Sequence, residues 1–113
     1  MELSMIRALL IAIAAVSAMR VHADAVTLLA PETALSCGKW LEVRKQSNQK
    51  SWDAESWLTG YVSGLAVGSK RDFLRRTDEA SILYWIDKYC RESPLSSPTA
   101  AVKALSDEIQ RKK

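Results

Sequence analysis

The segment 77–92 reads TDEASILYWIDKYCRE and has the clearest helical pattern in the chain. Its apolar side chains recur at spacings of three and four residues, which places them on one face of a helix that faces a core. That face comprises Ile82, Trp85, Ile86, Tyr89 and Cys90. Thr77 can cap a helix that begins at about Asp78, and Pro94 ends it. We therefore expect a core helix here.

Three other segments have helical patterns, and no run of alternating β-branched residues competes with them. The segment 33–45 has Thr33 as its expected N-cap and places Cys37, Trp40, Leu41 and Arg44 on one face. The segment from Ser51 to about Gly68 forms a second predicted helix, and a last helix follows Ser97 and Pro98. The sequence thus predicts an all-α fold, a small bundle of about four helices.

The composition fits one small domain. The chain has 113 residues, with 16 Lys and Arg against 13 Asp and Glu. Beyond residue 23 it has 14 basic and 12 acidic residues, a balance too even to indicate a nucleic-acid partner. The only histidine, His22, precedes that point, so the rest of the chain has no imidazole for Ser-His or Cys-His catalysis or for an ordinary zinc site.

The first 23 residues have the pattern of a cleavable signal peptide. Arg7 precedes the uncharged apolar run 8–18, which is shorter than the roughly 20 residues that span a bilayer. Small residues flank His22, so we expect cleavage after Ala23, with Ala18 and Ala25 as alternative positions. We therefore expect residues 1–23 to be removed on export, and residues 24–113 to form a single domain without stable membrane insertion.

Export makes the two cysteines informative, because lone cysteine pairs in small exported domains usually form a disulfide. Cys37 and Cys90 are the only pair, and they would join the first predicted helix to the third. A reactive thiol pair is the alternative, but redox motifs place their cysteines two residues apart at a helix start. The spacing of these two favours a structural bridge.

The carboxylates show no catalytic arrangement. Asp53 and Glu55 lie two apart at a predicted helix start, where they complement the helix dipole. Asp87 and Arg91 are four residues apart, so we expect them to pair on the outer face of their helix. No glycine-rich phosphate loop follows a strand. We therefore expect a protein that is not an enzyme and that needs no cofactor or metal.

Two segments are candidate partner-binding surfaces. The basic connector, residues 69–76, reads SKRDFLRR and has the one local excess of positive charge. We expect it to attract an acidic partner, with an aromatic side chain as the anchor. The candidate residues are Lys70, Arg71, Phe73, Arg75 and Arg76 in the connector and Trp52 beside the polar loop 46–50. The alternative is that the connector is only a solvated turn.

Gly60, Gly64 and Gly68 recur every four residues within the second predicted helix. Each interior glycine costs about 1 kcal/mol relative to alanine, so the row needs a physical reason. Close packing of another helix is the expected reason, and close approach of a binding partner is the alternative.

Three groups of residues resemble a known family. They are Cys37, the segment WLTGYVSG at 57–64, and the segment WIDKYC at 85–90 with Pro94 and Leu95. The pattern is similar to that of Rap/Tai-type periplasmic immunity proteins, which protect bacteria from peptidoglycan-amidase effectors of type VI secretion systems. The resemblance implies a periplasmic, helical, disulfide-linked protein that is often a homodimer and that obstructs an amidase without catalysis. A weaker likeness in size and cysteine count is to acid chaperones of the HdeA type, which implies an envelope stress protein without a dedicated toxin.

Overall fold

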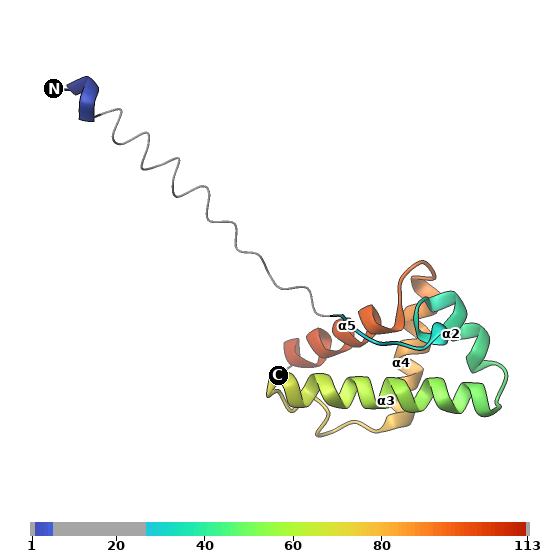
Figure 1. The fold of residues 1–113 in the computed structure, drawn as a ribbon. Coiled ribbons are helices and arrows are strands. Elements are labelled where there is room, and N and C mark those ends of the chain that lie inside the picture. Colours follow the sequence, from blue (N-terminus) through green and yellow to red (C-terminus); the bar gives the residue numbers. More distant parts are fainter. Residues whose placement is uncertain (1, 6–26, 113) are drawn as a thin grey trace.

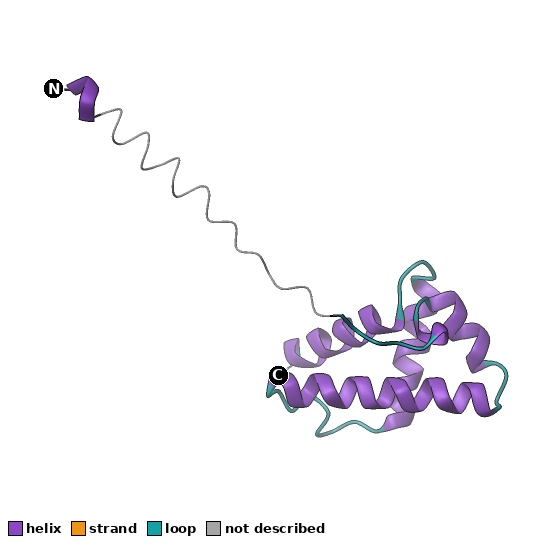
Figure 2. Cartoon of the chain, in the orientation of Figure 1, coloured by secondary structure: helices purple, strands orange, loops and turns teal. Residues whose placement is uncertain are grey.

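The computed structural model describes residues 2–5 and 27–112. Within those ranges the chain consists of helices joined by loops and contains no strand (Figure 2), so the all-α prediction is confirmed. The predicted cleavage positions after Ala18, Ala23 and Ala25 lie outside the described residues. In chain order, the elements are a 3-10 turn η1 at Glu32–Ala34, then α2 at Cys37–Arg44, α3 at Gln49–Ser69, α4 at Glu79–Glu92 and α5 at Pro98–Arg111.

The first long helix begins later than predicted, because Ser36 caps it in place of Thr33. The Ser36 hydroxyl accepts a hydrogen bond from the Lys39 backbone N–H at 3.2 Å, which satisfies a helix N–H that otherwise has no partner. The residues before Ser36 form η1 instead of a continuous helix. The predicted start was therefore wrong, although the predicted inward face was correct for Cys37 and Trp40, both buried.

Two other helix starts also differ from the prediction. Asn48 caps α3, and Ser51 lies inside that helix, where its hydroxyl accepts a hydrogen bond from the Asn48 backbone N–H in a capping box. Asp78 caps α4 in place of Thr77, through a 2.8 Å bond from the Ser81 backbone N–H. Only α5 begins as predicted, with Ser97 as its cap and Pro98 in its first turn.

Each of the four longer helices, which Figure 1 labels, contributes at least one large, fully buried side chain to the core. These side chains include Trp40 of α2, Leu58 of α3, Ile86 of α4 and Val102 of α5. α4 contacts both α2 and α5, and α3 also contacts α2 and α5. Each helix of this core thus buries its apolar face against at least two others.

The predicted disulfide is confirmed. Cys37, the first residue of α2, is bonded to Cys90 near the end of α4, with the two Cα atoms 4.8 Å apart. Neither cysteine is exposed to solvent. The bridge therefore lies within the core and ties the first of the long helices to the third.

Asp87 corrects the prediction of an outer-face pair with Arg91. It is buried, with 8% of its surface exposed, and its Oδ1 accepts a 2.8 Å hydrogen bond from the Trp40 indole. Arg44 also binds Asp87, with its Nη2 2.9 Å from Oδ2, and its Nη1 binds Glu55 of α3. The Asp87 carboxylate raises the pKa of the Arg44 guanidinium by hydrogen bonding. This polar cluster joins α2, α3 and α4.

Among the described residues, no helix combines the length and the apolar content that a membrane span requires.

Candidate functional site

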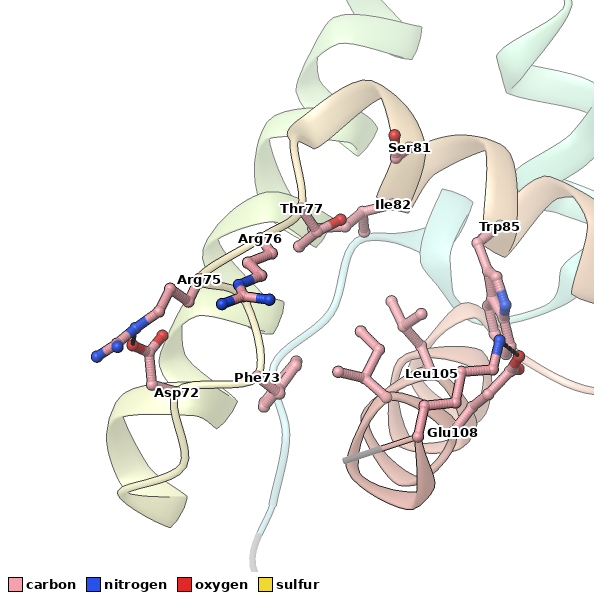
Figure 3. Close-up of a pocket in the computed structure, with 12 residues that line it drawn as sticks. Asp72, Phe73, Arg75, Arg76, Thr77, Ser81, Ile82, Trp85, Leu105 and Glu108 are labelled. Carbon is pink, nitrogen blue, oxygen red and sulfur yellow. Dashed lines mark hydrogen bonds and ion pairs between the residues drawn. The ribbon is translucent and has the colours of Figure 1, made fainter.

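A groove of about 900 Å³ lies beside the basic connector (Figure 3). We call it the connector groove. It lies between the loop that joins α3 to α4, the first half of α4 and the last half of α5. Its lining comprises Asp72, Phe73, Arg75, Arg76, Thr77, Ser81, Ile82, Trp85, Leu105, Glu108, Ile109 and Lys112.

The end of α3 determines how the connector reaches this groove. Lys70 adopts a left-handed conformation with φ of 53°, and its N–H bonds to the Ala66 and Val67 carbonyls, which ends the helix. Arg71 then donates its N–H to the Ala66 carbonyl at 3.2 Å, and the chain turns toward α4. This reversal carries Phe73 into the protein.

Phe73 is part of the core and is not the exposed anchor that the sequence predicted. Only 3% of its surface is exposed, and it belongs to the same apolar cluster as Ile82 and Leu105. Figure 3 shows Phe73 projecting from the connector, on the side of the groove opposite Trp85. Phe73 therefore contributes to the floor of the groove and cannot insert into a partner.

Apolar side chains complete the floor, and several of them were predicted only as core. Ile82 and Leu105 are buried, whereas Trp85 and Ile109 are half-buried and retain surface toward the groove. Their helical spacing correctly indicated an inward face, but it gave no sign that these parts of α4 and α5 border a groove. The groove forms only when the connector, α4 and α5 pack together. The basic motif at 69–76 therefore identified only the groove residues that belong to the connector.

Among the residues that the structure describes, the charged side chains lining the groove form two ion pairs and leave one cation outside them. Arg75 Nε lies 2.8 Å from Asp72 Oδ2, and Lys112 Nζ lies 2.9 Å from Glu108 Oε1. The hydrogen bond from Lys112 lowers the pKa of the Glu108 carboxyl. Arg76 is exposed and has no ion pair with any other residue that the structure describes. Arg76 is therefore the cation most available to a ligand.

The other two cations of the connector do not line the groove. Lys70 caps α3, while the Arg71 guanidinium donates a 2.6 Å hydrogen bond to the Gln110 side chain of α5. Arg71 thus fastens the connector to α5. Of the connector residues proposed from the sequence, the structure brings Phe73, Arg75 and Arg76 into one site and leaves Lys70 and Arg71 beside it.

Trp52 is exposed, as expected for a partner-binding side chain, with 59% of its surface accessible. It lies in the first turn of α3, however, and the connector follows the last turn. At 1.5 Å of rise per residue, these positions are about 25 Å apart along the helix axis. Trp52 and the connector groove are therefore separate surfaces.

The glycine row of α3 does not pack against another helix of this chain. A Cβ added at Gly60, Gly64 or Gly68 would have no neighbouring atom within 4 Å, and all three residues are exposed. The prediction of close helix packing within the described structure was therefore wrong. The row forms a smooth, open edge of α3.

No set of three or more His, Cys, Asp and Glu side chains among the described residues is arranged to hold a metal ion. The buried carboxylate of Asp87 has all its contacts within the polar cluster. Its arrangement is that of a structural cross-link.

In comparisons with family models, with curated proteins and with solved structures, nothing matches this chain.

Proposed function

We propose that this chain is an exported, non-enzymatic binding protein whose connector groove receives a segment of a protein partner. The observation that supports this is the groove itself, in which an apolar floor lies between cationic side chains from two parts of the fold. Concave apolar surfaces with a few polar groups at the edge are typical binding sites. Arg75 and Arg76 on one wall and Lys112 on the other give the site its polar edge.

The roles of the carboxylates support a function without catalysis. Asp78 caps α4, Asp53 accepts a hydrogen bond from Gln49, and Asp87 and Glu55 bind Arg44. Each is held by a neighbour on its own helix or by a cross-link between helices. General acid and base catalysis instead needs carboxylates that reach a substrate.

The partner that we propose is a secreted peptidoglycan amidase, which the protein would bind and obstruct. The resemblance to the Rap/Tai-type immunity proteins supports this assignment, and its two longer segments, 57–64 and 85–90, lie within α3 and α4. The signal-peptide pattern and the buried disulfide support a periplasmic location, because disulfides persist in oxidising compartments.

An inhibition assay on the purified, exported protein tests the proposal. The protein is immobilised and exposed to periplasmic and secreted fractions, and any stable complex is assayed for peptidoglycan amidase activity with and without added protein. We expect a complex in which amidase turnover is suppressed. Turnover of peptidoglycan fragments by the protein alone, or the absence of any stable complex, would contradict it. Suppression of protein aggregation at low pH without a dedicated complex would instead identify a chaperone of the HdeA type.

A further inference from the structure

We infer that the connector groove recognises an acidic protein segment that carries a large apolar side chain next to its carboxylates, with Arg76 as the specificity-determining cation. This inference rests on the proposed function, because it specifies the chemistry of the partner segment that enters the groove. The structure distinguishes Arg76 from the other cations of the basic connector, whereas the sequence alone could not.

The floor of the groove accounts for the apolar part of the segment. Trp85 of α4 and Ile109 of α5 are half-buried and face the hollow over a base of buried Phe73 and Leu105. A partner side chain placed there would remove this remaining apolar surface from water. Large apolar side chains that enter such pockets usually supply most of the affinity of a protein interface.

The charges around the floor account for the acidic part. The carboxylates of Asp72 and Glu108 are engaged with Arg75 and Lys112, whereas Arg76 has no such partner among the described residues. The Arg75–Asp72 pair is solvent-exposed, with side-chain exposures of 77% and 60%, and in the other pair Lys112 is 75% exposed while Glu108 is half-buried. Exposed pairs of this kind contribute little, so Arg75 and Lys112 can exchange partners at small cost.

The placement of the cations favours a peptide over a single-headed amphiphile such as a fatty acid. Arg75 and Arg76 lie on the connector wall, and Lys112 lies at the end of α5 on the other side of the apolar floor. A fatty acid has one carboxylate at one end and would leave one wall without a partner. A peptide that crosses the groove can place carboxylates on both sides of an apolar side chain, which matches this arrangement.

Three synthetic peptides provide the test. They share a central Phe-Leu pair that is flanked on both sides by Glu, by Gln or by Lys, and their binding to the exported protein is measured by calorimetry at low and high salt. We expect the Glu peptide to bind about tenfold more tightly than the Gln peptide at low salt, and the Lys peptide to bind most weakly. The Glu preference should shrink at high salt because the charges are exposed.

Two variants assign the preference to Arg76. Arg76→Gln should reduce the Glu-over-Gln ratio to within about threefold, because it removes the groove cation that has no ion pair with any described residue. Lys50→Gln is the matched control, since Lys50 is an exposed cation in the first turn of α3, at the other end of that helix, and it should leave the ratio unchanged. Trp85→Phe keeps the charges and an aromatic ring. It should remove the tryptophan fluorescence change on binding, while the three peptides should keep the same order of affinity.

Equal binding of the three peptides, no binding of any, or the same effect of Arg76→Gln and Lys50→Gln would overturn the inference. Tighter binding of dodecanoate than of the Glu peptide would also overturn it and would assign the groove to a lipid. These outcomes differ from failure of the proposed function. If an amidase complex forms and Arg76→Gln does not weaken it, the function stands and only the groove assignment fails.

Discussion

The Trp40 indole donates a 2.8 Å hydrogen bond to the Asp87 carboxylate across 47 positions of sequence. This bond joins α2 to α4 inside the protein, and Arg44 of α2 adds a hydrogen bond from Nε, 3.1 Å from the same oxygen. One acidic side chain therefore accepts hydrogen bonds from two residues of another helix. No buried side-chain nitrogen or oxygen among the described residues lacks a hydrogen-bond partner.

Replacement of Asp87 should destabilise the fold strongly. Asp87→Ala leaves the Trp40 N–H and part of the Arg44 guanidinium without their acceptor, and we expect the free energy of unfolding to fall by about 2–4 kcal/mol. Urea unfolding measures the change. The matched control is Asp107→Ala, which removes an exposed carboxylate paired with Lys103 and should change stability by less than about 0.5 kcal/mol. Similar values for the two variants would show that the polar cluster is not a stabilising cross-link.

Loss of the disulfide should have a comparable effect. The bridge closes a loop between cysteines separated by 53 positions, so the double variant Cys37→Ala with Cys90→Ala should lose on the order of 4 kcal/mol. Chemical denaturation with and without reductant measures this loss in the wild-type protein. Thiol titration of the purified protein should find no free thiol before reduction. Two free thiols in the folded, unreduced protein would contradict the prediction.

Alanine at the open glycines should stabilise the protein. Gly60 and Gly64 lie inside α3 with nothing near the position of an added Cβ, so Gly60→Ala and Gly64→Ala should each raise the free energy of unfolding by about 0.5–1 kcal/mol. Thermal unfolding at several protein concentrations tests this. Destabilisation that grows with protein concentration would instead show that a second copy packs closely on this edge.

Acid should weaken the start of α4 through Asp78. Hydrogen bonds from Ser81, first from its backbone N–H, lower the pKa of this carboxyl below its usual 3.8. The ionised cap therefore contributes its full stability above about pH 3.8, and this contribution is lost as the pH falls through the lower pKa of the folded state. Asp78→Asn retains a capping side chain that does not titrate, so the stability of this variant should fall less between pH 5 and about pH 2. Parallel pH profiles for the two proteins would contradict this.

The helical class was predictable because α4 and α5 each show one continuous apolar stripe, and the disulfide followed from two cysteines on inward faces. Helix starts were less predictable, because Thr33 and Ser36 are both good caps. The choice between them depends on where the chain enters the core. At α3, Asn48 and Ser51 belong to one capping box. The sequence therefore indicated where the helix begins, but it did not show which of these two residues is the N-cap.

From the sequence, only the connector residues of the candidate site could be predicted, and the contributions of α4 and α5 could not. The cations on either side of Phe73 predict an exposed side chain, but the left-handed turn at Lys70 directs it into the core. The spacing of Asp87 and Arg91, one helical turn apart, predicts a pair on the outer face of the helix. Local spacing cannot show that Arg44 and Trp40, more than 40 positions away, offer it stronger partners.

The disulfide also determines what happens when a protease cuts the basic connector. The basic connector lies within the covalent loop that Cys37 and Cys90 close, and it exposes several lysine and arginine side chains to solvent. A cut at one of these sites would leave two fragments that the bridge still holds together, with both halves of the core in place. In a denaturing gel without reductant, such nicked molecules would migrate as one covalent species, and reductant would separate the two fragments. A cut in the exposed connector therefore does not by itself release a fragment.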